Sequence, residues 1–287
     1  MIMTKTLRNL RLAALCSAAL LPTTQAETIW ADGVGENIGW YDANKTHEDD
    51  APEDEYGFPL VDVAASDDGM CYAAATSNLL AWWQDRHVAP AGTPQGIDNI
   101  WSTFVKNSTK ISGSNVPNAL TWWLTGTDPA YILNTHSGYY SSVIPAGTEL
   151  YNSQKKDLFI VKYANPTSAD IITMLTAGAP VALATSAHTL TLWGAEYDSD
   201  GKITKLFITD SDDYTGKPDL LTVEATITSK NSIDFTLDGD KFTIQNAFTI
   251  NPEVGYSWGL TPIVPEPATA TLSLMALAAL AARRRRH

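Results

Sequence analysis

The chain has 287 residues, of which 44% are hydrophobic, and a formal net charge of −13 at pH 7. This length and apolar content allow one globular domain with a sizeable core. The acidic balance argues against nucleic acid or an anionic membrane surface as the partner of the folded part, because both would repel it.

Residues 1–26 have the pattern of a signal peptide. A short basic segment is followed by an apolar run at 12–21, which is too short to span a bilayer, and by a small-residue cleavage site at 24–26. We therefore predict export. Removal of this segment leaves Cys71 as the only cysteine, so the exported protein would contain a free thiol in an oxidising environment.

The next two segments are predicted to be an arm and a loop. Residues 28–46 contain short β-prone pieces interrupted by glycines, and we expect a strand or an extended arm packed on the domain. Residues 47–68 are rich in Asp and Glu and also contain prolines, which predicts an exposed loop.

A helix is predicted directly after this loop. Apolar residues recur at helical spacing from Ala74 to Trp83, and Asp67 or Asp68 is placed to cap the start. Cys71 would then lie in the first turn, where unpaired N–H groups and the helix dipole favour a thiolate. The same position also fits a simpler interpretation, in which Cys71 is a small buried residue that packs the helix.

Helices come first in the remaining chain, and strands follow. Helical patterns cover 97–105, 115–124 and 168–178, the last with Ser168 as its predicted cap, while 131–143 fits a strand or a loop. Period-two patterns predict strands at 181–184, 189–197, 203–209, 220–227 and 241–250. This order predicts an α+β fold in which a helical half packs against an antiparallel sheet half.

Two of these strands form a predicted hairpin around a turn at 198–201. Its register places His188 opposite residue 211, between Asp210 and Asp212. A carboxylate beside an imidazole fixes its tautomer and stabilises its protonated form. The hairpin therefore predicts a His–Asp pair, although solvated acids at the end of a surface hairpin would produce the same pattern.

Residues 264–287 contain a Pro-Glu-Pro tripeptide, an apolar run and four consecutive arginines. This segment resembles the PEP-CTERM sorting signal of Gram-negative bacteria. The resemblance implies transient membrane contact, processing by an exosortase-type sorting protease, and a location at the cell surface or outside the cell. The short, Ala-rich run also fits a weak membrane anchor.

Four sequence blocks resemble those of the IdeS/Mac family, which comprises papain-like cysteine endopeptidases first known as immunoglobulin-degrading enzymes. The blocks occur in the family's order, with weaker similarity over most of 28–250, and they cover residues 39–46, 71–83, 188–195 and 208–212. The resemblance implies one papain-like peptidase domain at 27–263 that acts on a protein or peptide substrate.

The same resemblance implies a role for each residue of the site. Cys71 is the nucleophile and His188 is its general base. Asp210 orients the imidazole, with Asp212 in support, and Lys45 contributes to the oxyanion hole. From the residues alone, Lys45 would be interpreted as a solvated surface lysine, and nothing in them supports immunoglobulin as the substrate.

The chain departs from the family at three places, one of which is a shorter segment between the predicted strand at 181–184 and His188. Tyr72 replaces the glycine that usually follows the nucleophile, and the acidic segment 47–68 looks like an insertion that would shield the cleft, act as a lid or bind substrate. Because of these departures, the physiological substrate is left open. The sequence also leaves open the oligomeric state and the removal of the C-terminal segment.

Two other functions are compatible with the sequence. One is a different Cys–His–Asp acyl-transfer enzyme, such as a cell-wall amidopeptidase, and the other is a surface binding module whose catalytic site is no longer used. We expect no metal site and no cofactor, because the histidines share no ligand spacing. His47 and His87 are interpreted as solvated loop residues.

Overall fold

The computed structural model describes residues 26–45, 67–109, 114–155, 158–212 and 218–263. The predicted signal peptide up to residue 25, the predicted sorting signal at 264–287 and residues 47–66 of the acidic segment, with His47, lie outside these ranges. Within the described ranges, no helix combines the length and the apolar character that crossing a membrane requires.

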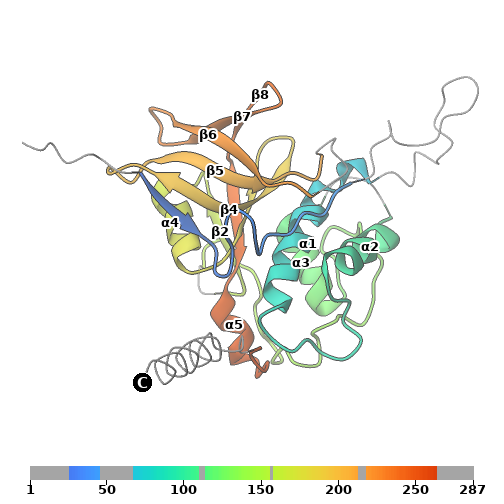
Figure 1. Cartoon of the computed structure of the whole chain (residues 1–287). Coiled ribbons are helices and arrows are strands. Elements are labelled where there is room, and N and C mark those ends of the chain that lie inside the picture. The colour runs from blue at the N-terminus through green and yellow to red at the C-terminus, as the bar shows by residue number, and fades with distance from the viewer. Residues whose placement is uncertain (1–25, 46–66, 110–113, 156–157, 213–217, 264–287) are drawn as a thin grey trace, which may run out of the picture.

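The described part has an α+β architecture in which a mainly helical half packs against an antiparallel sheet (Figure 1). The sheet has nine strands in the order β2-β9-β3-β4-β5-β6-β7-β8, with β1 paired to β4. The strands are β1 (Glu27–Trp30), β2 (Ile160–Ala164), β3 (Val181–Ala184), β4 (Thr189–Tyr197), β5 (Ile203–Thr209), β6 (Leu221–Ile227), β7 (Ile233–Leu237), β8 (Asp240–Thr243) and β9 (Asn246–Ile250).

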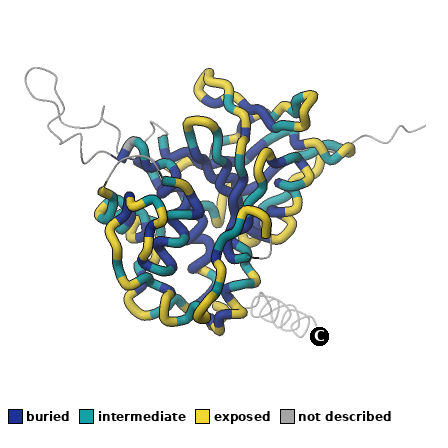
Figure 2. Tube along the Cα trace, turned by 180° about the vertical axis from the view of Figure 1, so that it is seen from behind, coloured by how far each residue is buried: buried dark blue, intermediate teal, exposed yellow. Residues whose placement is uncertain are grey.

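Helices cover both faces of the central strands. They are α1 (Cys71–Gln84), α2 (Ile97–Asn107), α3 (Val116–Thr125), α4 (Ser168–Thr176) and α5 (Pro252–Ser257). In β3, Ala182 belongs to the core formed with α1 and α3, whereas Val181 and Leu183 belong to the core formed with α4. Because successive strand side chains point to opposite faces, the centre of the sheet is buried on both sides. Figure 2 shows the buried residues gathered in the middle of the molecule and the exposed ones at its hairpin tips and outer loops.

The central element of the helical half is α1. Every residue from Tyr72 to Gln84 is buried, and the helix contacts α2, α3 and β4. It follows a 3-10 turn (Asp68–Met70), and its N-cap residue is Met70, without a side-chain cap. The prediction that Asp67 or Asp68 caps this helix is therefore wrong, because the extra turn separates both residues from its start.

The other predicted helices are confirmed, with one correction. The patterns at 97–105 and 115–124 correspond to α2 and α3, and 131–143 is a loop. The cap of α4 is Thr167 rather than Ser168. The Thr167 hydroxyl accepts the Asp170 N–H, and the Asp170 carboxylate accepts the Thr167 N–H, which makes a capping box.

Most of the predicted strands are also confirmed. Those at 181–184, 189–197 and 203–209 are β3, β4 and β5, and the one at 220–227 is β6. The predicted strand at 241–250 is divided, because β8 pairs with β7 whereas β9 pairs with β2 and β3. Neither β2 nor β7 is among the predicted strands.

The hairpin of β4 and β5 has a register shifted by one residue from the prediction. Thr191 pairs with Thr209, and a bulge follows between Leu192 and Gly194. Continued beyond the last pair, this register places His188 opposite Asp212 rather than residue 211. The shift keeps His188 at the same end of the hairpin as both carboxylates.

The predicted N-terminal arm is β1, which pairs with the second half of β4. Trp30 of this arm stacks on Phe207, with ring centroids 4.4 Å apart. A β-carbon added at Gly194 would lie 2.5 Å from the Trp30 ring and 2.8 Å from the carbonyl oxygen of Ile29. The arm therefore fits against β4 because this position carries no side chain.

We expect Gly194→Ala to lower the free energy of unfolding by about 1–3 kcal/mol, because the added methyl group overlaps the arm. Gly35→Ala is the matched control, since an added β-carbon there meets only Ile38, at 3.8 Å. Thermal and urea denaturation of both variants measure the difference. Equal stability of the two variants would contradict the close packing of β1 on β4.

Candidate active site

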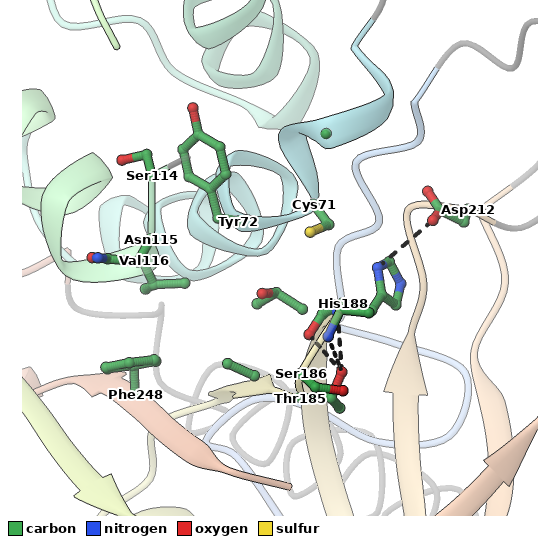
Figure 3. Close-up of a pocket in the computed structure, with 14 residues that line it drawn as sticks. Cys71, Tyr72, Ser114, Asn115, Val116, Thr185, Ser186, His188, Asp212 and Phe248 are labelled. Carbon is green, nitrogen blue, oxygen red and sulfur yellow. Dashed lines mark hydrogen bonds and ion pairs between the residues drawn. The ribbon is translucent and has the colours of Figure 1, made fainter. Parts of the chain in front are cut away.

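Cys71 is the first residue of α1 and lies at a cavity of about 450 Å³ between the two halves of the molecule (Figure 3). The helical half contributes α1 and the residues around the start of α3. The sheet half contributes the end of β3, the turn into β4, and Phe248 of β9. Cys71 is only partly buried. Its thiol is therefore accessible from the cavity, which argues against the interpretation of Cys71 as a packing residue.

His188 lies in the same cavity, in the tight turn between β3 and β4. The turn is closed by Thr185, whose N–H donates to the His188 carbonyl at 2.8 Å and whose hydroxyl accepts the His188 N–H at 3.0 Å. The imidazole is 11% exposed. This turn therefore fixes the backbone of His188, and Figure 3 shows the imidazole at the same cavity as Cys71, with one ring nitrogen facing Asp212.

Asp210 holds the other side of the imidazole. Its Oδ1 is 2.6 Å from His188 Nε2, and its side chain is 5% exposed. It also accepts the N–H of Asp212 at 3.0 Å. Because Nε2 is bonded to Asp210, the ring turns Nδ1 away from Asp210, on the side where Asp212 lies 3.6 Å from that nitrogen.

Asp212 contacts His188 less closely than Asp210 does. Its Oδ2 is 3.6 Å from His188 Nδ1, which is too long for a hydrogen bond, and its side chain is 37% exposed. Its Oδ1 forms an ion pair with the ammonium group of Lys45. Asp212 therefore bridges the imidazole and the lysine, and its shorter contact is with the lysine.

Lys45 is buried, with a side chain that is 6% exposed, so the residue is not the solvated surface lysine that the sequence alone indicates. Its backbone N–H donates to the carbonyl oxygen of Ser211 at 2.9 Å. This bond occupies the backbone donor. The side-chain ammonium is in turn paired with Asp212.

The electrostatics of the site favour an ion pair between the thiol and the imidazole. Burial raises the pKa of Cys71, but the hydrogen bond and charge of His188, the charge of Lys45 and the backbone amide of Thr189 outweigh it and lower the pKa. Burial lowers the pKa of His188, whereas its bonds to Asp210 and Cys71 raise it to about 10. Burial also opposes ionisation of Asp210, but the hydrogen bond to His188 outweighs it and lowers that pKa.

Among the described residues, one cluster has the composition of a metal site. Ligand atoms of His188, Asp210 and Asp212 lie within 4.8 Å of one another. The same atoms are engaged with each other and with the ammonium of Lys45. A cation at this cluster would have to displace the lysine and break the His188–Asp210 hydrogen bond, so the donor set fits a hydrogen-bonded triad better than a metal centre.

His87 does not have the environment that the sequence predicts. The residue is 3% exposed, and its ring packs against Trp83 with centroids 4.0 Å apart. Its Nε2 lies 3.1 Å from the hydroxyl of Tyr140, and burial lowers its pKa to about 4. His87 is therefore a neutral core residue and not a solvated one, because its ring packs between the side chains of Trp83 and Tyr140.

A set of buried polar residues beside the site was not predicted. Asn78 of α1 forms hydrogen bonds with Ala43, Thr191 and Thr209, at the point where the helix meets the hairpin. The signal available in the sequence is a polar amide inside an otherwise apolar helix. That signal does not identify the partners, which come from distant segments.

Two family models match this chain. Residues 164–230 match the Mac 1 model, and residues 264–286 match the PEP-CTERM protein-sorting motif. A search of curated proteins finds no match. The first segment contains His188, Asp210 and Asp212 but neither Cys71 nor Lys45. The matches confirm the resemblance to the IdeS/Mac family and to the PEP-CTERM signal.

We expect iodoacetamide to alkylate native Cys71 at about pH 6, well below the ordinary thiol pKa of about 8.5. Because its pKa is lowered, Cys71 keeps a thiolate fraction at a lower pH than an ordinary thiol does. His188→Ala should move the reactivity to higher pH, since the imidazolium is lost. Mass spectrometry of the Cys71 peptide measures the rate at each pH, with Cys71→Ala as the blank. Alkylation that begins only on unfolding would contradict the ion pair.

Proposed function

We propose that this protein is an exported cysteine endopeptidase of papain-like fold, which hydrolyses peptide bonds of an extracellular protein. The observation that carries the proposal is the geometry of the cavity: a cysteine at the start of a central helix and an imidazole held at its far nitrogen by a buried carboxylate. This arrangement suits nucleophilic attack by a thiolate and proton transfer by the imidazole.

The first half of the reaction forms a thioester. The Cys71 thiolate attacks the carbonyl carbon of the scissile peptide bond, and the carbonyl oxygen becomes an oxyanion. The backbone N–H of Cys71 and the ammonium of Lys45 stabilise that charge. His188, which starts as an imidazolium, donates its proton to the leaving amine as the C–N bond breaks.

The second half regenerates the enzyme. Neutral His188 takes a proton from a water molecule, and the resulting hydroxide adds to the thioester carbonyl. Collapse of this intermediate breaks the C–S bond and releases the carboxylic acid product, which restores the thiolate and the imidazolium. Asp210 keeps the ring oriented through both halves and stabilises its positive charge.

Three further observations support the proposal. A central helix that starts with the nucleophile, an antiparallel sheet that supplies the base, and a cavity between them together fit a papain-like arrangement. The Mac 1 match spans the segment that contains the proposed base and acids. The PEP-CTERM match supports export, membrane association and processing by an exosortase-type system in a Gram-negative bacterium.

The direct test is cleavage of fluorescently labelled casein and of a mixture of secreted proteins. We expect Cys71→Ala and His188→Ala each to reduce cleavage by at least about 10³-fold, because the nucleophile and its base act as one unit. Circular dichroism and thermal denaturation verify that both variants fold. Unchanged cleavage by either folded variant would contradict the proposed mechanism. Cleavage of muropeptides in place of proteins would favour the cell-wall amidopeptidase.

The two carboxylates should differ in their effect. We expect Asp210→Asn to reduce kcat by about 10²–10⁴-fold, because it leaves the imidazole in the wrong tautomer. Asp212→Asn should cost less, since Asp212 lies 3.6 Å from the ring and its main partner is Lys45. Steady-state kinetics with labelled casein measure both. Equal losses would contradict the separate roles of the two acids.

A further inference from the structure

Asn78 lies on α1 two helical turns beyond Cys71, about 10 Å along the axis, and it does not line the cavity. Its side chain is buried, with 3% of the residue exposed. The amide oxygen accepts the N–H of Ala43 at 2.9 Å. The amide nitrogen donates to the hydroxyls of Thr191 at 3.0 Å and of Thr209 at 3.3 Å.

Each partner of Asn78 lies close in the sequence to a member of the site. Ala43 precedes Lys45 by two residues. The other two partners lie on the hairpin: Thr191 follows His188 by three residues, and Thr209 comes directly before Asp210. One buried amide therefore connects the four segments that carry the proposed catalytic groups, which are Cys71, Lys45, His188 and Asp210.

The two threonines that bond this amide are themselves buried in the sheet. Thr191 and Thr209 are cross-strand partners, and each is 1% exposed. The hydroxyl of Thr209 accepts the indole N–H of Trp193 at 3.0 Å and donates to the carbonyl oxygen of Tyr41 at 3.1 Å. The amide orientation is fixed, because its oxygen faces a backbone N–H and its nitrogen faces two hydroxyls.

Few side chains could replace Asn78 and keep its hydrogen bonds. One acceptor and two donors are needed within the volume of a short side chain. Leucine fills the volume but has neither, and aspartate supplies no donor. Replacement of Asn78 by leucine would leave the buried N–H of Ala43 without its acceptor. A buried unpaired group destabilises the contact between the segments. A small displacement between a nucleophile and its base lowers the rate sharply, because catalysis needs both in reacting geometry.

We propose that Asn78 is a positioning residue whose amide sets the placement of the β4–β5 hairpin and of the Lys45 segment on the nucleophile helix. The inference rests on the function proposed above. Asn78 acts through Thr191, Thr209 and Ala43 and does not touch the substrate. Its contribution is to hold the imidazole and the sulfur at the separation at which their ion pair forms.

The test compares Asn78→Leu with Ser77→Ala. Ser77 is the matched control, because it is fully buried on the same helix and its hydroxyl donates to the Ala73 carbonyl within that helix. We expect Asn78→Leu to slow alkylation of Cys71 by iodoacetamide at least about 10-fold at about pH 6 and to shift the alkylation profile to higher pH. It should also reduce kcat for labelled casein about 10²-fold with KM changed little. Ser77→Ala should leave all of these values unchanged.

A second pair of variants separates positioning from folding. Thr209→Val keeps the shape of the side chain but removes the hydroxyl, whereas Thr209→Ser keeps the hydroxyl. We expect Thr209→Val to shift the alkylation profile as Asn78→Leu does. Thr209→Ser should keep the profile of the unmodified protein. Thermal denaturation of every variant verifies that each is folded at the assay temperature.

The outcomes distinguish this inference from the proposed function. A folded Asn78→Leu variant with the alkylation profile and kcat of the unmodified protein would overturn the role of Asn78 and leave the peptidase proposal intact. An unmodified protein whose Cys71 shows no reactivity near pH 6 would overturn the peptidase proposal, and the role of Asn78 with it.

Discussion

The charge pairing of Cys71, His188 and Asp210 depends on the contact between α1 and the β4–β5 hairpin. The sulfur belongs to the helical half, and the imidazole and carboxylate belong to the sheet half. Neither half contains the complete set. The pairing also requires a site that is only partly closed, since full burial would raise the pKa of the thiol and lower that of the imidazole. The cavity between the halves meets this condition, because Cys71 is only partly buried there. Asp210, by contrast, is almost fully buried behind the imidazole.

Lys45 adds a fixed cation to this arrangement. In a chain with a large excess of acidic residues, a lysine that is 6% exposed requires a specific partner, and Asp212 supplies it. The ammonium also lowers the pKa values of Cys71 and Asp210. The segment before the acidic stretch thereby becomes part of the site, although it lies far from the hairpin in the sequence.

The Mac 1 match covers only a part of the site that the geometry brings together. The Mac 1 match at 164–230 covers the hairpin whose ends carry His188, Asp210 and Asp212, and it begins well after the helix α1 that carries Cys71. The position of Cys71 in the cavity connects that segment to α1. The sorting motif at 264–286 is independent of both, and it indicates export and anchoring at the surface of a Gram-negative bacterium.

Local periodicity and turn residues were enough to predict α1 with Cys71 in its first turn, the helices α2 to α4, and the hairpin that brings His188 to Asp210 and Asp212. Tertiary structure decided the rest, because it depends on contacts between distant segments. The ion pair of Lys45 with Asp212, the burial of His87 and the bonding partners of Asn78 have no local signature. A buried polar side chain finds its partners only when the helix and the sheet have docked, and no pattern along the chain records which groups will then meet.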